Sequence, residues 1–304
     1  MSVQAVLYTF FRGLARLAQA LPRRTALAAG VGFATAAFGL YRLTPYRGFI
    51  QKNLRGAFPD MPAAQADAVA LAHLRQLTRC IAELMRLPLL KADSVDALVR
   101  FEGWEHLEAA RAEGKGVILL TAHFGNWELM GASFAAKGLP LHVLVQPASQ
   151  DAFDKLFREF RGAAGVSTWN NAGPASLRPV LRALGRNEAL GLLVDQHGEA
   201  QDAIVKFFGH PVSAPTGPFF FARRTGAAVV PVFPVRQADD THRIHIEPAI
   251  ALTGDAEADA QTADAVLGSD IRRHPDHWLW VHDRWAREHE LTRQPGTRRQ
   301  EVPA

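Results

Sequence analysis

The chain has 304 residues, of which 48% are hydrophobic, so it is long enough for one large core with a small appendage. Its single cysteine, Cys80, excludes an internal disulfide, and the Cys/His spacings of structural zinc sites are absent. The first 59 residues contain eight Lys or Arg and no Asp or Glu, so the other 245 carry a net charge of −4. This basic leader predicts an anionic partner for that segment.

The first elements expected along the chain are two helices in the leader. Apolar side chains recur at helical spacing between residues 3 and 21, and residues 25–41 contain no charged side chain. That uncharged stretch is marginal for crossing a bilayer, which takes roughly 20 apolar residues. We therefore expect residues 1–55 to form an amphipathic and hydrophobic helical membrane-anchor region that lies on an anionic bilayer or inserts partly into it.

Two other interpretations of the leader remain open. Its helices could belong to the core of a soluble domain, or its basic residues could bind nucleic acid. The second is disfavoured, because the segment lacks a known nucleic-acid-binding module and is rich in apolar residues.

From residue 56 to 291 the pattern alternates between strands and helices. It predicts an α/β domain with a mixed, mostly parallel central sheet flanked by helices. Strands are expected near the start of 95–116 and at 117–123, 141–146, 189–195, 228–236 and 243–252, the last closing the sheet. Helices are expected at 63–88, in the second half of 95–116, at 126–138, 151–165 and 176–188, within 211–226 and over 274–289. Residues 292–304 are expected to form a flexible tail.

A strand-to-helix turn in the segment LLTAHFGNWEL holds the candidate chemistry. His123 follows a buried strand, and Glu128 falls in the first turn of the next helix, with Asn126 as the expected N-cap. The carboxyl edge of an open α/β sheet is where ligands bind. We expect His123 to act as a general base that Glu128 orients, while Gly125 gives the turn freedom and lets substrate approach. Amides at the helix start would bind an oxyanion.

The residues around this turn closely resemble the lipid A biosynthesis (late) acyltransferases, of the lauroyl/myristoyl transferase type. These belong to the glycerolipid acyltransferases with the His-x4-acid motif. The resembling blocks include FEGWEHLEAARAEGKGVILLTAHFGNWEL, NLRGAFPD, IAELMRLP, LLVDQ and HWLWVHDRW, and together they span roughly residues 5 to 290. The resemblance implies the glycerolipid acyltransferase-like fold.

Site residues follow from the same resemblance. It implies that His123 and Glu128 are the catalytic pair. It also implies a substrate-binding arginine at Arg161, with Arg158 one turn earlier as the fallback, and a functional aspartate at Asp195. With Asn126 and Gly125 these residues complete the expected substrate-binding set. No metal site and no cofactor are expected. The three tryptophans of HWLWVHDRW, and Cys80 in its apolar stretch, are expected to pack in the core.

The expected reaction is O-acyl transfer, with acyl carrier protein, or alternatively coenzyme A, supplying the acyl thioester. The expected acceptor is a hydroxyl of a lipid A intermediate, approached at the cytoplasmic face of the cell inner membrane by a monomer that binds no nucleic acid. Two alternatives remain. One is the same chemistry on a glycolipid, ornithine lipid or lysophospholipid, and the other is an inactive protein that binds lipid or acyl carrier.

Overall fold

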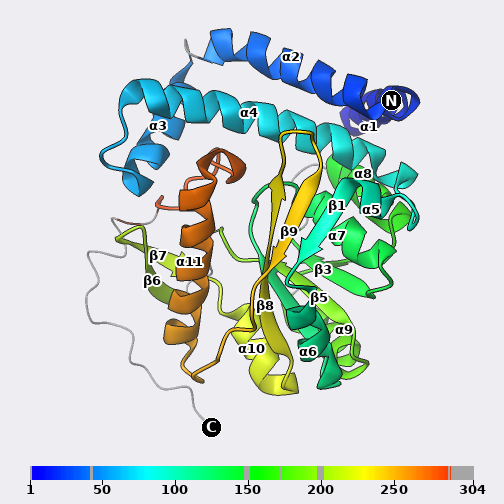
Figure 1. Ribbon diagram of the computed structural model, residues 1–304, viewed down its shortest axis with the longest axis vertical. Helices are drawn as coiled ribbons and strands as arrows, with labels where there is room; N and C mark the ends of the chain where they lie inside the picture. The colour runs from blue at the N-terminus through cyan, green and yellow to red at the C-terminus, as the bar shows by residue number, and fades with distance from the viewer. Residues whose placement is uncertain are drawn as a thin grey trace.

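The structure is a computed structural model that describes residues 2–41, 44–146, 151–171, 173–196, 202–286 and 288. The tail predicted at 292–304 lies outside these ranges. Four helices form a layer over one end of the α/β body, as Figure 1 shows. They are α1 (Val3–Ala20), α2 (Arg23–Tyr41), α3 (Pro45–Ala57) and α4 (Ala63–Arg86). The two predicted leader helices are thus present as helices, and α3 was not predicted.

The body is built on a seven-stranded sheet with the strand order β1-β9-β8-β2-β5-β3-β4. Neighbouring strands are parallel except β8 and β9, which pair antiparallel. The strands are β1 (Val99–Glu102), β2 (Val117–Thr121), β3 (Leu141–Val145), β4 (Val166–Asn170), β5 (Ala189–Leu193), β8 (Ala228–Arg236) and β9 (His242–Ile246). The sheet is therefore mixed and mostly parallel, as predicted.

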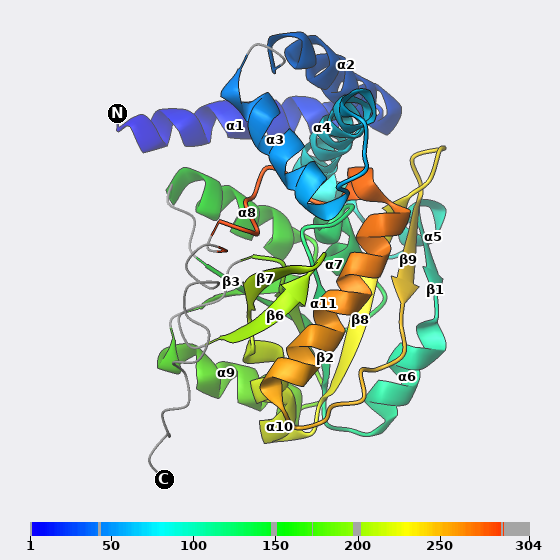
Figure 2. The ribbon, with the colours of Figure 1, turned by 90° about the vertical axis from the view of Figure 1, so that its left-hand side faces the viewer.

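Helices cover both faces of this sheet, as the two views in Figure 1 and Figure 2 show. Apolar side chains fill the two interfaces. The helices are α5 (Val95–Leu98), α6 (Trp104–Ala112), α7 (Trp127–Ala136), α8 (Asp151–Ala163), α9 (Pro174–Gly185), α10 (Gly217–Thr225) and α11 (Ala256–Arg273), with short 3₁₀ turns η1 (Leu87–Leu89) and η2 (Pro275–His277). A two-stranded hairpin, β6 (Ala203–Phe207) and β7 (His210–Ala214), forms a separate small sheet.

Three predictions about the body were wrong or incomplete. The final helix lies at 256–273 rather than 274–289. It ends immediately before His274-Pro275, because proline lacks the backbone N–H that a helix interior needs. Strand β9 does not end the sheet, since β1 pairs on its outer side. Strands β4, β6 and β7 were not predicted, and each of these three strands is only five residues long.

The segment after α11 packs as core without being a regular helix. The three tryptophans of this block, Trp278, Trp280 and Trp285, are all buried, as predicted. The backbone at Trp278 forms a β-bridge with Phe124, directly after the predicted catalytic histidine. The segment that follows α11 thereby comes back to the centre of the sheet.

Several basic residues of the helical layer form ion pairs within the protein. Arg12 pairs with Glu159 on α8, Arg23 with Glu83 on α4, and Arg47 with Asp67. Less positive charge is therefore left for an anionic partner than the sequence implied. Among the helices in the described part of the chain, none combines the length and the apolarity needed to cross a bilayer.

Candidate active site

Two neighbouring parallel strands bring His123 and Asp195 together. Strands β2 and β5 are in register, with Thr121 opposite Leu193, and each functional residue follows two positions after its strand end. The two side chains therefore meet at the carboxyl edge of the sheet, which faces α4 (Figure 1). Nδ1 of His123 lies 2.9 Å from Oδ1 of Asp195, and the backbone N–H of His123 donates to Oδ2 at 3.0 Å.

The carboxylate of Asp195 is buried and accepts a third hydrogen bond, from the segment that follows α11. Nε1 of Trp278 donates to Oδ2 of Asp195 at 2.9 Å. Trp278 is held there because the backbone on both sides of it pairs with the turn at residues 123–125. Gly125 N–H donates to the His277 carbonyl, and Leu279 N–H donates to the His123 carbonyl. The sequence predicted Trp278 only as a core residue, and its spacing contains no signal for this hydrogen bond.

The charges around His123 favour its protonated form. Burial lowers the pKa of His123, but the negative charge and hydrogen bond of Asp195 outweigh it, so the pKa stands above its ordinary value. Burial likewise raises the pKa of Asp195, and the charge and hydrogen bonds of His123, with the bond from Trp278, bring it below the usual range. Since an ionised carboxylate only accepts hydrogen bonds, Nδ1 must hold the proton in neutral His123, which leaves Nε2 as the basic atom.

Glu128 has a different partner from the one predicted. Its two carboxylate oxygens accept a forked pair of bonds from Arg161, with Nε to Oε2 at 2.8 Å and Nη2 to Oε1 at 2.5 Å. Nε1 of Trp127 also donates to Glu128, at 3.1 Å. The prediction that Glu128 fixes the His123 tautomer is therefore corrected, because the hydrogen-bond partner of Nδ1 is Asp195. Glu128 still raises the pKa of His123 through its charge, after the larger effect of Asp195.

The two predicted arginines lie on α8 and differ in their surroundings. Arg161 contacts Glu128 beside the cavity, and its guanidinium lies 5.7 Å from the ring centre of Phe157. Arg158, the fallback, pairs instead with Asp154 at 2.6 Å and donates to the Thr168 carbonyl on β4. The structure thus places Arg161 at the site and directs Arg158 toward the edge of the sheet.

Gly125 and Asn126 shape the turn, and neither lines the cavity that His123 and Glu128 line. Gly125 has a φ of +55°, and a β-carbon there would collide with the carbonyl oxygen of Pro234 on β8. The backbone freedom predicted for Gly125 is confirmed, but the close neighbour is β8. Asn126 is the predicted N-cap of α7, since its Oδ1 accepts from Leu129 N–H at 3.0 Å. Its side chain is buried and does not line the cavity, so the structure adds no support to the predicted substrate contact of Asn126.

A cavity of about 780 Å³ opens at this edge of the sheet and is lined by both polar and apolar side chains. Its polar part includes His123, Glu128 and Arg161. The apolar lining continues between the sheet and α7 along Leu119, Met130, Phe134, Leu141, Val143 and Val166. The volume falls in the range of pockets for small organic ligands. An extended apolar group could therefore lie along the sheet with its reactive end beside His123.

Within the residues that the structure describes, His, Cys, Asp and Glu form no group of three that could hold a metal ion. Cys80 is buried in α4 and its thiol donates to the Gly125 carbonyl at 3.1 Å. Burial raises the pKa of this thiol to about 12, which agrees with its predicted place in the core.

Comparison of the sequence with known protein families finds a match over most of the chain. The model of the bacterial lipid A biosynthesis acyltransferases matches residues 3–287, which is nearly the whole chain.

Individual relatives are more distant. A phosphatidylinositol mannoside acyltransferase of Mycobacterium tuberculosis is 26% identical over 245 residues, covering 78% of this chain and 76% of its own. A lipid A biosynthesis palmitoleoyltransferase of Escherichia coli is 26% identical over 243 residues, covering 77% of both chains. A lipid A biosynthesis acyltransferase of Haemophilus influenzae is 25% identical over 233 residues, covering 76% and 73%.

Proposed function

Because the chain belongs to the bacterial lipid A biosynthesis acyltransferase family, and is an acyltransferase that acts on a lipid acceptor, we propose that it moves a fatty acyl chain from a carrier thioester to a lipid hydroxyl. The observation that carries this proposal is the His123–Asp195 pair, in which His123 lines a cavity that has a long apolar part. A base that is oriented by a buried carboxylate, next to space for a fatty chain, fits direct acyl transfer.

In the proposed step, Nε2 of His123 takes the proton from the acceptor hydroxyl as its oxygen attacks the thioester carbonyl carbon. The charge of the tetrahedral intermediate falls on the former carbonyl oxygen, which amides at the start of α7 stabilise. The carbon–sulfur bond then breaks, and the thiolate leaves with the proton from His123. Asp195 stabilises the imidazolium between these two proton transfers. No acyl-enzyme forms, so both substrates must bind together.

Arg161 and Glu128 have a separate role in this proposal. The forked ion pair uses two of the five guanidinium N–H groups, and the remaining donors of Arg161 are suited to a phosphate on either substrate. Glu128 would then hold Arg161 in place and neutralise it while the site is empty. The pair therefore positions substrate, whereas His123 and Asp195 move the proton.

The proposed acceptor is a lipid A intermediate and the proposed donor is acyl-acyl carrier protein. A glycolipid acceptor is the second candidate, because the relative in Mycobacterium tuberculosis is named for phosphatidylinositol mannoside and is as similar as the Escherichia coli relative. Acyl-coenzyme A is the alternative donor.

Helix α1 supports a place at the cytoplasmic face of the inner membrane. Its outward face is a stripe of exposed apolar side chains, Val3, Val6, Phe10, Leu14 and Leu17. The opposite face packs on α8, where Tyr8 donates to Glu159 at 2.7 Å and the ring centres of Phe11 and Phe153 are 4.7 Å apart. Because α8 also lines the cavity through Phe157 and Arg161, a bilayer in contact with α1 would lie close to the site.

The direct test uses the purified protein with mixed micelles that contain a lipid A precursor or a phosphatidylinositol mannoside. Each acceptor is offered acyl-acyl carrier protein and acyl-coenzyme A in separate reactions, and products are identified by mass spectrometry. We expect one added acyl chain on the lipid A precursor. The lipids of a deletion strain should lack the same chain. Transfer to neither lipid from either donor, by folded protein, would contradict the proposal.

A further inference from the structure

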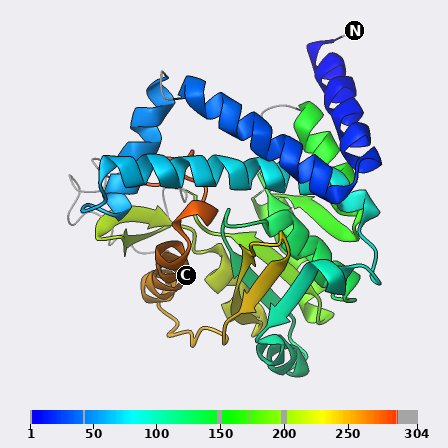
Figure 3. The same cartoon turned by 45° about the horizontal axis from the view of Figure 1, so that its top comes forward.

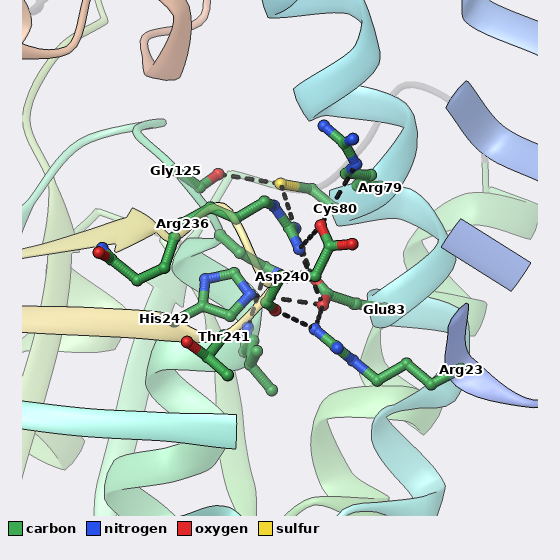
Figure 4. A network of polar contacts seen from close by, with 12 residues as sticks. Arg23, Arg79, Cys80, Glu83, Gly125, Arg236, Asp240, Thr241 and His242 are labelled. Carbon is green, nitrogen blue, oxygen red and sulfur yellow. Dashed lines mark hydrogen bonds and ion pairs between the residues drawn. The ribbon is translucent and has the colours of Figure 1, made fainter. Parts of the chain in front are cut away.

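A second buried polar cluster lies outside the cavity, between the helical layer and the catalytic turn. At its centre is Glu83 on α4, whose side chain is 4% exposed. Figure 4 shows donors from several elements converging on this carboxylate. Since a buried carboxylate is costly unless donors surround it, the cluster fixes the relative positions of the elements that supply them.

The donors to Glu83 come from four different parts of the chain. Arg236 at the end of β8 contributes a forked pair, with Nη1 to Oε1 at 3.1 Å and Nη2 to Oε2 at 2.5 Å. Arg23 at the start of α2 donates to Oε1, and His242 on β9 lies 3.4 Å from the same oxygen. Nδ2 of Asn126 donates to Oε2 at 2.6 Å.

Asn126 connects this cluster to the site. Glu83 only accepts hydrogen bonds, so the amide of Asn126 must turn its NH₂ group toward Glu83. This orientation leaves Oδ1 free to accept the Leu129 N–H and to cap α7. Asn126 is also the residue between the turn from His123 and the first turn of α7, which contains Glu128. One side chain therefore sets both the cap and the path of the turn.

The turn is held on its other side by rigid neighbours. Gly125 packs on the Pro234 carbonyl of β8, and its own carbonyl accepts the Cys80 thiol from α4, one helical turn before Glu83. Arg236, two residues after Pro234, is the main partner of Glu83. Helix α4 and strand β8 both contact the turn, and the buried ion pair between Glu83 and Arg236 joins these two elements.

From this geometry we propose that Glu83 is a positioning residue for acyl transfer. Through Asn126 it fixes the turn that places His123 and the amides of α7, and through Arg23 it ties that turn to helix α2 of the outer layer. The inference rests on the proposed function for its catalytic meaning. Glu83 does not touch substrate, and its effect passes through the position of the base.

Three variants of the full chain test the link. Glu83→Gln keeps the size of the side chain but weakens the acceptor, while Asn126→Asp keeps the α7 cap and replaces the donor with a carboxylate that repels Glu83. The double variant Glu83→Gln/Asn126→Asp reverses the bond, because the glutamine amide can donate to the new carboxylate. The double variant also keeps one negative charge near Arg236, with the carboxylate moved from residue 83 to residue 126.

We expect each single variant to lower kcat by about 10- to 10²-fold, since a displaced base loses alignment, with KM changed by no more than about twofold. The double variant should recover most of the lost kcat. A folded Glu83→Gln protein with wild-type kcat would overturn the inference. A double variant no faster than the slower single variant would overturn it as well, even if Glu83→Gln alone does not fold.

Nuclear magnetic resonance of the His123 ring separates this inference from the proposed function. The ring signals of His123 should shift in Asn126→Asp and return toward wild type in the double variant, with or without any acyl acceptor. If the wild-type protein transfers no acyl group but these shifts occur, the proposed function fails and the positioning of His123 stands. Ring signals of His123 that stay unchanged in Asn126→Asp would overturn the positioning itself.

Discussion

The α/β body and the helical layer differ in how they treat their apolar surface. The body buries apolar side chains on both faces of the sheet and pairs His123 with Asp195 at the carboxyl edge. The layer packs one face on the body and leaves large apolar residues exposed, with Phe10 59%, Phe33 71% and Leu40 69% exposed. Figure 3 shows these helices extended over the body. The difference indicates a division in which the body performs the chemistry and the layer provides a surface.

The largest expected effect belongs to the body. Replacing the base with His123→Ala should lower kcat by about 10² to 10⁴-fold, the usual contribution of general-base catalysis. The variant should remain folded and should bind vesicles as the wild type does. The matched control is His106→Ala on α6, which follows β1 at the opposite end of the sheet and should keep full activity. A His123→Ala protein with near-wild-type turnover would remove the assigned base.

Asp195→Asn should have the next largest effect. The amide cannot stabilise the imidazolium and can hold the wrong tautomer, so we expect kcat to fall by about 10²-fold. The pH dependence should change as well. His123 must be neutral to accept a proton, so kcat/KM falls as the pH drops through its raised pKa. Without the charge of Asp195 that pKa falls, and the loss of activity should move to lower pH. An unmoved profile would contradict the pairing.

The same contrast explains what the sequence could predict. The alternation of strands and helices predicted the sheet, and the position of His123 after a buried strand indicated it as the proposed base. The partner of His123 was missed because it depends on strand order. Asp195 is 72 residues away along the chain and becomes adjacent only because β5 pairs with β2 in register. Glu128 was favoured because it is close in sequence, whereas its actual partner, Arg161, comes from α8.

Residues that act by position were harder still to predict. Glu83 stands in a helix whose pattern predicts packing, and its contacts with Arg236 and Asn126 come from distant segments. Trp278 was expected only in the core, and its indole N–H meets Asp195 through a backbone bridge at Phe124. In both cases the sequence shows the residue type, and only the fold shows which polar atom it reaches.

The smallest expected effect belongs to the layer. Phe10→Ser/Leu17→Ser on the exposed face of α1 should weaken binding to anionic vesicles by at least about tenfold. Full burial of each apolar side chain would contribute about 1.5–3 kcal/mol, so even partial burial of the two exceeds the roughly 1.4 kcal/mol of a tenfold change. Turnover on a detergent-dispersed acceptor should be unchanged. Thr9→Ser/Ala20→Ser, off the apolar stripe of the same helix, is the control and should bind like the wild type. Equal vesicle binding by all three proteins would contradict the assigned surface.

The most direct test of the His123–Asp195 assignment is the pKa of His123, measured by nuclear magnetic resonance in the wild type, Asp195→Asn and Glu128→Gln. We predict a wild-type pKa above the ordinary histidine value, a large fall in Asp195→Asn, where burial then dominates, and a smaller fall in Glu128→Gln. A larger fall in Glu128→Gln than in Asp195→Asn would show that the neighbouring glutamate, and not Asp195, governs the base.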